Sequence, residues 1–297
     1  MNNLHAKTLD IINLNVTLPN GHRLLRDVSL SLDPGEVRAL VGESGAGKSM
    51  IGKAVLGILP TGISISQGEI LLEGTHLNAL TPATRRKTIA QTSALIPQDP
   101  LTALNPVRKI GPQITDPLTR IHGWTKARAL ARTRELLDRV HIRNPDRVLN
   151  SYPHELSGGM RQRILIAAAF APSPRLIVAD EPTTALDVTV QKEILRLIRE
   201  LQRETGTGVL FVTHDMGVVA KISQKVTVLF GGRVVEDAPT HRIFENPEHA
   251  YTRALIAATP TPNASTEPFR PVPPALIAEL HREIQADDDR FSKRAHR

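Results

Sequence analysis

The sequence predicts an α/β protein with a mostly parallel β-sheet that is covered by helices on both faces. Short apolar runs rich in β-branched residues alternate with segments of helical periodicity along the 297 residues, which is typical of strands joined by crossover helices. A glycine-rich turn at residues 42–49 lies between one such run and one such helical segment. Hydrophobic residues make up 40% of the chain and charged residues 23%. We therefore expect a sizeable core in one large domain with an inserted part, or in two domains.

The first part of the chain predicts a small β-rich layer that leads into the glycine-rich turn. Proline and glycine favour turns, so Pro19-Asn20-Gly21 and Asp33-Pro34-Gly35 are expected to separate short strands. Three strands are expected before the glycine-rich turn and one after it, at residues 11–18, 28–32, 37–41 and 69–72.

The glycine-rich turn has the pattern G-x-x-x-x-G-K-[ST] and precedes a helix expected at residues 50–59. Its glycines let backbone N–H groups turn inward to a phosphate, and the helix presents its positive end to the same anion. Lys48 would reach the outer phosphates, and the Ser49 hydroxyl would bind Mg²⁺. The sequence thus predicts a nucleotide-binding loop that consists of Gly42, Glu43, Ser44, Gly45, Ala46, Gly47, Lys48 and Ser49.

The middle of the chain predicts a helical insertion at about residues 100–165. Prolines interrupt the segment from residue 97 to residue 117, and an amphipathic helix is expected at 125–142. Alternation then resumes, with strands and one helix expected at residues 176–179, 190–204 (the helix), 209–212 and 226–230. Gly231-Gly232 predicts a hairpin turn into a further strand at 234–236.

The last segment is expected to form a tail, residues 261–297, after a nucleotide-binding domain of residues 1–260. The tail begins as a proline-rich linker. Leu276, Leu280 and Ile284 then fall on one helical face. A helix this short is marginal alone, so it either docks on something or is disordered, and we favour docking.

Two carboxylates follow the apolar strand at 176–179. Asp180, at the end of a buried strand, would reach the Mg²⁺ beside Ser49, and Glu181 would orient and deprotonate an attacking water. An apolar run that ends in Asp-Glu is common by itself, and the upstream loop makes it informative. His214 follows the next strand, so it is expected at the same sheet edge, where ligands bind in open α/β sheets.

A second anion-binding helix terminus is predicted at Ser157, Gly158 and Gly159, before an apolar helix at 164–170. With these motifs in order, residues 9–258 resemble the ATP-binding cassette (ABC) ATPases. Residues 156–163, LSGGMRQR, look like the signature motif of that family. Gln98 matches its Q-loop, residues 185–187 match its D-loop, and His214 matches its switch histidine.

The resemblance implies a P-loop NTPase (RecA-like) core with an N-terminal antiparallel β layer and an inserted α-helical subdomain. It implies ATP hydrolysis with Mg²⁺, in which Lys48, Glu181 and His214 are catalytic. The implied ligands of the metal are Ser49, Gln98 and Asp180. Gln98 is also implied to be one of the residues that bind the nucleotide. In such ATPases two domains dimerise head to tail, so Ser157, Gly158 and Gly159 would serve the partner's ATP.

Two segments narrow the resemblance to the ATPases of peptide/nickel importers. Residues 98–106 look like their extended Q-loop, and 244–260 resemble their C-terminal hallmark, although Ala250 stands where proline is usual. The implied location is peripheral, on the cytoplasmic face of the cell membrane. The implied partners are a second ATPase subunit, two transmembrane permease subunits and, indirectly, an extracytoplasmic solute-binding protein. The solute, and whether the ATPase pair is a homodimer or a heterodimer, stay open.

Two positions depart from the family pattern. Leu18 stands where an aromatic residue usually stacks on adenine, and an aliphatic side chain lacks a stacking contribution of about 0.5–1.5 kcal/mol. Many subfamily members carry a cysteine cluster in the tail, whereas this chain has no cysteine. The sequence therefore excludes an Fe–S cluster or a zinc-thiolate site built from this chain.

Composition and charge leave one other class of function open. The net charge is +7, which suits nucleic acid, anionic lipid or a solvated basic face. A soluble ABC ATPase that acts on nucleic acid or ribosomes is therefore the alternative. Aromatic residues are only 3% of the chain, which disfavours a single-strand stacking surface, and we expect no nucleic-acid partner. Residues 1–5 lack the layout of a signal peptide, and no run of 18 apolar residues occurs.

Overall fold

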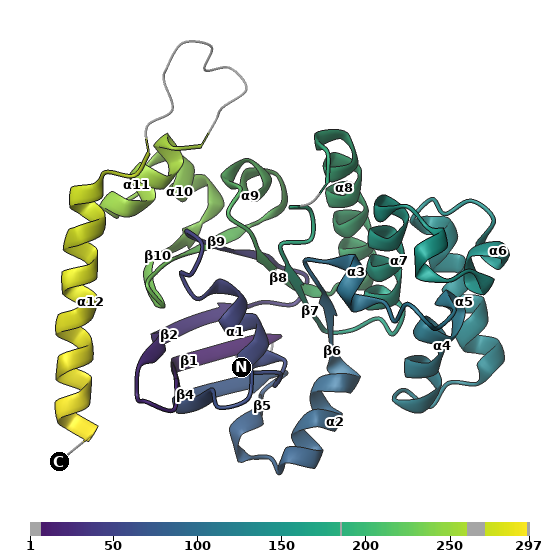
Figure 1. The fold of residues 1–297 in the computed structure, drawn as a ribbon, viewed down its shortest axis with the longest axis horizontal. Coiled ribbons are helices and arrows are strands. Elements are labelled where there is room, and N and C mark those ends of the chain that lie inside the picture. The colour runs from purple at the N-terminus through teal and green to yellow at the C-terminus, as the bar shows by residue number, and fades with distance from the viewer. Residues whose placement is uncertain (1–6, 185, 260–270, 296–297) are drawn as a thin grey trace, which may run out of the picture. The chain divides into compact units, whose positions relative to one another are not determined.

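The computed structural model describes residues 7–184, 186–259 and 271–295 (Figure 1). The chain divides into two compact units. The phosphate-loop unit consists mainly of residues 9–32, 36–78 and 211–295. The helical unit consists mainly of residues 79–210, and the boundary falls inside strand β8 (Gly208–Val212).

An antiparallel sheet in the phosphate-loop unit contains the predicted N-terminal β layer. Its strand order is β2-β1-β4-β5, and its strands are β1 (Leu9–Thr17), β2 (Arg23–Leu32), β4 (Ser64–Leu72) and β5 (Thr75–His76). Leu9 of β1 lies opposite Leu32 of β2 and Leu72 of β4, and all three are buried. β4 begins well before the predicted residue 69, because glycine is accommodated at a bulge. A Cβ on Gly68 would lie 2.4 Å from the Asn13 carbonyl oxygen.

The same unit contains a second group of strands, in the order β10-β9-β3. β3 (Val37–Val41), which is buried at every position, runs parallel to β9 (Lys225–Phe230). β10 (Arg233–Pro239) is antiparallel to β9. The turn between them is the predicted two-residue hairpin, because Gly231 and Gly232 have φ angles of 52° and 77°. Both angles suit a turn that only glycine adopts without strain.

The helical unit contains the predicted helical insertion and extends beyond its predicted bounds of about 100–165 on both sides. Parallel strands β6 (Ser93–Ile96) and β7 (Leu176–Asp180) lie in this unit. Its helices are α2 (Pro82–Thr92), α3 (Pro100–Ala103), α4 (Ile110–Arg120), α5 (Lys126–Arg139), α6 (Pro145–Asn150), α7 (Gly158–Phe170) and α8 (Val188–Thr205). The amphipathic helix predicted at 125–142 is α5, and Ala129, Leu136 and Leu137 form its buried face.

The prolines of this region interrupt the chain less than the sequence predicts. Pro100 is the first residue of α3, and Pro117 lies inside α4. Proline fits the first turn of a helix because the backbone N–H that it lacks has no partner there. Pro117 is followed by only one more turn, which ends at Arg120. The expectation that these prolines break the chain is therefore wrong for both residues.

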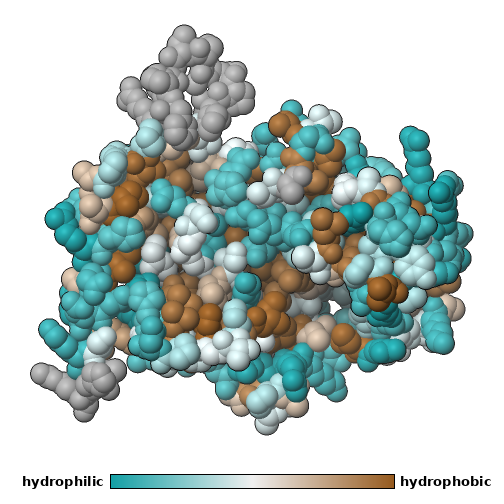
Figure 2. Space-filling view, viewed as in Figure 1, coloured by the Kyte–Doolittle hydropathy of each residue, from teal (hydrophilic) through white to brown (hydrophobic). Residues whose placement is uncertain are grey.

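The C-terminal part of the phosphate-loop unit is helical, with α9 (Met216–Ile222), α10 (Thr240–Glu245), α11 (Ala250–Ala257) and α12 (Pro274–Ala295). Leu280 of α12 joins the buried core that contains Val226, Phe230 and Tyr251, and Leu276 and Ile284 pack against this core. The predicted docking of the tail helix is thus confirmed, and the helix is longer than the apolar positions indicate. In Figure 2 the lower part of α12 presents mainly hydrophilic side chains outward. Most of the proline-rich linker lies outside the described residues.

None of the helices in the described ranges combines the length and the apolar character that crossing a membrane requires.

Candidate active site

The glycine-rich loop joins β3 to α1 (Lys48–Val55) in the phosphate-loop unit. Gly42 has a φ of 148°, and a Cβ there would lie 2.2 Å from the carbonyl oxygen of Leu229 in β9. Gly47 directly precedes α1 with a φ of 97°. The strand, the turn and the helix stand in the order that the sequence predicts. The positive end of α1 therefore begins where the loop ends, which suits an anion such as phosphate.

Lys48 is buried at the start of α1, and only 5% of its surface is exposed. Its Nζ donates to the carbonyl oxygens of Gly42 and Glu43, both at 2.8 Å. The Lys48 ammonium group therefore folds back onto the first two residues of the glycine-rich loop. A buried ammonium group beside the N-terminal end of a helix suits the binding of an anionic group.

Tyr251 of α11 also contacts this loop, and the sequence analysis misses this residue. The backbone N–H of Glu43 donates to the Tyr251 hydroxyl oxygen at 3.1 Å. The Tyr251 side chain is completely buried, and burial raises the pKa of Tyr251 to about 12. Residues 244–260, which contain Tyr251, resemble a family motif. The motif does not indicate which residue the Tyr251 hydroxyl contacts.

The two predicted carboxylates lie at the end of β7 in the helical unit. Asp180 is the last residue of that strand, and Glu181 follows with a φ of 46°. Left-handed backbone is uncommon for a residue with a side chain and is concentrated at functional sites. The Glu181 carboxylate accepts hydrogen bonds at Oε2 from Gln98 Nε2 at 3.2 Å and from Thr184 Oγ1 at 3.0 Å. The structure thus brings together Gln98 and Glu181, two predicted site residues, and adds Thr184.

The predicted second helix terminus is the start of α7. Ser157 caps this helix, and its hydroxyl accepts a hydrogen bond from the backbone N–H of Met160 at 3.3 Å. A Cβ added to Gly158 would meet nothing within 4 Å. The nearest atom to a Cβ on Gly159 would be Val190 Cγ1, at 3.7 Å. The helix end is therefore open on the side of Gly158.

The remaining predicted positions lie at strand ends and caps. His214 is exposed after β8, next to Thr213, whose backbone N–H donates to the Leu40 carbonyl oxygen of β3 at 3.1 Å. Asp187 of the predicted D-loop caps α8 and accepts from two backbone N–H groups, whereas Ala185 lies outside the described residues. Leu18 is half-buried at the turn after β1.

The predicted site residues are therefore divided between the two units. The phosphate-loop unit carries the glycine-rich loop, Lys48, Ser49 and His214. The helical unit carries Gln98, Asp180, Glu181 and the residues that precede α7.

A family model described as "ABC transporter" matches residues 25–184, more than half of the chain. This chain belongs to the ABC transporter family. A second family model, "Oligopeptide/dipeptide transporter, C-terminal region", matches residues 235–285. As an ABC transporter ATPase, the protein hydrolyses ATP, and its mixed α/β fold is the predicted one.

Named relatives and solved structures agree with this assignment. The oligopeptide transport ATP-binding protein OppD of Bacillus subtilis is 44% identical over 244 residues, which are 82% of this chain and 68% of that protein. The dipeptide transport ATP-binding protein DppD of Lactococcus lactis is 41% identical over 271 residues, with 90% of this chain and 78% of that protein covered. The structure of cbiO1 from Clostridium perfringens, part of an ABC transporter complex, has a TM-score of 0.71 at 25% identity, and 84% of this chain and 95% of that chain are covered. The dimeric structure of the bacterial ABC transporter cassette MJ0796 has a TM-score of 0.69 at 27% identity, with 78% and 98% covered.

Proposed function

We propose that this protein is the ATP-hydrolysing subunit of an importer whose solute is a peptide. The observation that carries the proposal is the match of a peptide-transporter C-terminal region to residues 235–285, in the same chain as the ABC core. Relatives named for oligopeptide and dipeptide transport support the same solute class. Nickel and other small solutes are the competing cargoes that the sequence resemblance leaves open.

We assign the binding of the ATP phosphates to residues 42–49. The loop is glycine-rich where its backbone is tightest, and Lys48 places a buried ammonium group at its base. A buried ammonium group and inward N–H groups favour a polyphosphate over a neutral ligand. Ser49, Gln98 and Asp180 are the proposed ligands of Mg²⁺, and hydroxyl, amide and carboxylate oxygens are donors that this ion prefers. Mg²⁺, when bound, would neutralise charge that develops on the phosphate oxygens.

We assign the role of general base to Glu181. Hydrogen bonds from Gln98 and Thr184 hold the Glu181 carboxylate in one orientation, which supports a role as the base that acts on a water. His214 is proposed to donate a hydrogen bond to the terminal phosphate, because it is exposed directly after the buried end of β8. Lys48 would stabilise the negative charge that develops on the oxygens of the terminal phosphate and on the leaving-group oxygen.

We propose that the working form contains two ATPase subunits and two transmembrane permease subunits. The ATPase subunits would lie at the cytoplasmic face of the membrane. A solute-binding protein would act through the permeases. Ser157, Gly158 and Gly159 would contact the ATP of the partner subunit, which agrees with an open helix end at Gly158. The segment that follows Gln98 is proposed to be the docking surface for the permeases. Its apolar side chains Leu101 and Val107 are 64% and 80% exposed, which supports this proposal.

Uptake in the native cell tests the solute class. The chromosomal copy would be replaced by a Glu181→Gln variant, with the wild-type copy restored in a matched control strain. We expect uptake of a labelled dipeptide or oligopeptide to be lost and nickel uptake to be unchanged. Loss of nickel uptake alone would replace the peptide proposal. Affinity purification of the chain with nucleic acid or ribosomes, and without two polytopic membrane proteins, would overturn the importer.

A further inference from the structure

The C-terminal helices contact the glycine-rich loop at two separate points. The first contact is direct, because the Glu43 backbone N–H donates to the Tyr251 hydroxyl. Phe230 packs edge-on against Tyr251, with 5.0 Å between ring centroids, and His281 of α12 lies 5.1 Å from Phe230 on the same measure. The beginning of the loop is therefore held by the Tyr251 ring, which packs on Phe230 of β9, and Phe230 in turn contacts His281 of α12.

The second contact passes through Arg26 and the glycine hairpin. Asp288 of α12 accepts two hydrogen bonds from Arg26, and the Nη1 group of Arg26 donates to the Gly231 carbonyl oxygen at 2.7 Å. The backbone N–H of Arg26 donates to Gly232 at 2.8 Å, and the N–H of Gly232 donates to Ala46 at 3.0 Å, both to carbonyl oxygens. Asp288 is thus joined through three consecutive contacts to the residue before Gly47.

The two arginines at this contact are buried, so they require carboxylate partners to neutralise their charge. Arg23 and Arg26 are 2% and 5% exposed. Asp288 Oδ1 accepts from Arg23 Nε at 2.8 Å, Asp287 also pairs with Arg23, and the Phe291 ring lies over the same guanidinium. A buried guanidinium without a carboxylate is strongly unfavourable. Burial opposes ionisation of Asp288, yet the hydrogen bonds from Arg26 and Arg23 lower its pKa below the ordinary value.

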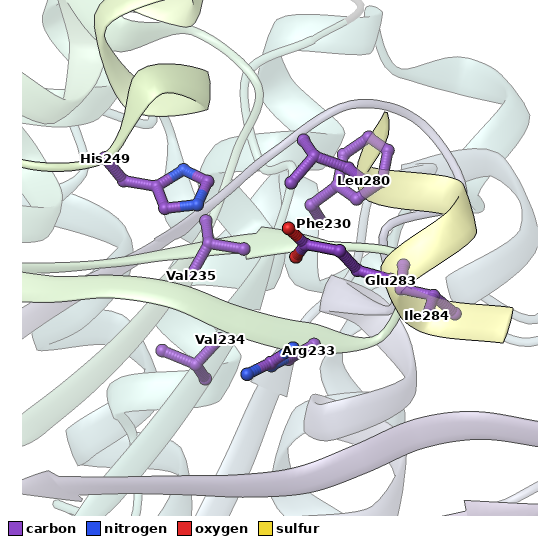
Figure 3. Close-up of a pocket in the computed structure, with 8 residues that line it drawn as sticks. All are labelled: Phe230, Arg233, Val234, Val235, His249, Leu280, Glu283 and Ile284. Carbon is purple, nitrogen blue, oxygen red and sulfur yellow. The ribbon is translucent and has the colours of Figure 1, made fainter. Parts of the chain in front are cut away.

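Apolar contacts seat α12 on the hairpin in the position that these ion pairs require. Ile284 approaches Gly231 so closely that a Cβ on this glycine would lie 2.2 Å from Ile284 Cδ1. Figure 3 shows Leu280 and Ile284 of α12 beside Phe230, with Val235 of β10 across a small pocket. Arg233 and Glu283 border this pocket. The helix is therefore held by both apolar packing and buried charge.

We propose that Tyr251 and Asp288 are positioning residues for the phosphate loop, so that a docked C-terminal segment sets the affinity of the protein for ATP. This inference rests on the proposed role of residues 42–49. Tyr251 fixes the loop at Glu43, and Asp288 fixes it at Ala46, on either side of the exposed residues Ser44 and Gly45. A loop fixed at both ends loses less freedom when it binds phosphate.

The test measures ATP binding by the full-length protein in four variants. Tyr251→Phe removes the acceptor for Glu43, and Asp288→Asn removes the charge that faces Arg26. Each has a matched control. Tyr152→Phe changes the other tyrosine of the chain. Asp289→Asn changes a neighbouring acid of α12 that accepts a hydrogen bond from Gln285 of the same helix. One lost hydrogen bond predicts weaker ATP binding by about 2- to 10-fold in Tyr251→Phe and Asp288→Asn, and no change in the controls.

Two further readouts separate positioning from general damage. Hydrogen exchange at residues 43–47 should accelerate in both test variants, while β1 and β4 keep their protection. In the assembled transporter, KM for ATP should rise with kcat nearly unchanged, because the loop contributes equally to bound substrate and transition state. Asp288→Glu, which keeps the charge, should recover part of the affinity.

Unchanged ATP affinity and unchanged exchange at 43–47 in both test variants would overturn this inference. Lys48→Ala distinguishes that outcome from failure of the proposed site. If wild-type protein binds ATP and Lys48→Ala binds it equally well, the assignment of residues 42–49 fails instead. If Asp288→Asn does not fold, Tyr251→Phe and Asp288→Glu still give the affinity and exchange results.

Discussion

Gln98 and Glu181 are joined by a hydrogen bond of 3.2 Å between Gln98 Nε2 and Glu181 Oε2. Gln98 follows β6 and Glu181 follows β7, and these two strands are parallel neighbours. The ends of adjacent parallel strands lie at one edge of a sheet, so two residues far apart in the sequence meet there. The contact holds the Glu181 carboxylate in a fixed orientation, which its proposed role as the base that acts on one water molecule requires.

Replacement of Glu181, the proposed general base, should stop turnover without stopping binding. In Glu181→Gln, we expect ATP hydrolysis to fall by about 10²- to 10⁴-fold, the usual contribution of general base catalysis. The amide keeps nearly the same shape, so ATP affinity should stay within a few-fold of wild type. Phosphate release and equilibrium ATP binding, measured on one preparation, check both statements. A variant with full hydrolysis would remove Glu181 from the mechanism.

Loss of the Gln98 amide should have a smaller effect of the same kind. Gln98→Ala removes the hydrogen bond from Nε2 to Glu181 Oε2 and leaves the one from Thr184 in place. We expect kcat to fall by about 2- to 10-fold, which corresponds to one net hydrogen bond. Thr184→Val provides the complementary deletion, and the double variant should show more than the sum of the two free-energy losses if both hold one carboxylate. Strict additivity would argue against a shared role.

Glycine at position 232 should be required for stability, beyond the requirement of its backbone angle. A Cβ on Gly232 would lie 2.1 Å from the Leu24 carbonyl oxygen, whereas a Cβ on Gly21 meets nothing within 4 Å. Both residues have positive φ, so both alanine variants carry backbone strain of about 1–2 kcal/mol. Gly232→Ala should lose a further amount of about 1–3 kcal/mol through overpacking. Urea denaturation of the two variants side by side measures the difference, and equal losses would contradict the clash.

Tyr251 should ionise at unusually high pH in the native protein. Burial disfavours the charged phenolate and raises the pKa of Tyr251 from 10.0 to about 12. Because the native pKa lies above the unfolded value, this residue contributes stability that is fully present below pH 10 and is lost as pH rises toward 12. The chain has two tyrosines, so a Tyr152→Phe variant isolates Tyr251. Its tyrosinate absorbance should appear near pH 12, and an earlier step would mean that the ring is accessible to water.

Features that depend on neighbouring residues are predictable from this sequence. The strand Val37–Val41 is recognised because a run of five residues, four of them apolar, precedes a glycine-rich turn, and the structure has the strand with the same limits. The hairpin at Gly231-Gly232 is recognised because both glycines permit positive φ. Ser157 is recognised as the first residue of an anion-binding helix end, and the structure places it as the cap of α7.

Features that depend on distant residues are not. Nothing near Tyr251 indicates that its hydroxyl meets the backbone of Glu43. The acids after Ile284 look like a solvated end of a helix, yet Asp288 lies against two buried arginines of β2. The helix therefore continues to Ala295, past the apolar residues that predict it. Hydrophobic periodicity identifies the face that packs, but it does not identify charged partners that come from another part of the chain.

The pairing of Arg26 with Asp288 spans 262 residues, and this separation has a consequence during synthesis. Arg23 and Arg26 leave the ribosome when Asp287 and Asp288, the acids of α12 that pair with them, have not yet been translated. At the usual pace of elongation the wait lasts roughly 10–50 s. The β1–β2 ribbon of a nascent chain must keep these guanidinium groups in water until α12 arrives, so the phosphate loop acquires its final support last. Ribosomes that stall or terminate early near the 3′ end of the message would release chains that carry every nucleotide motif but lack that support.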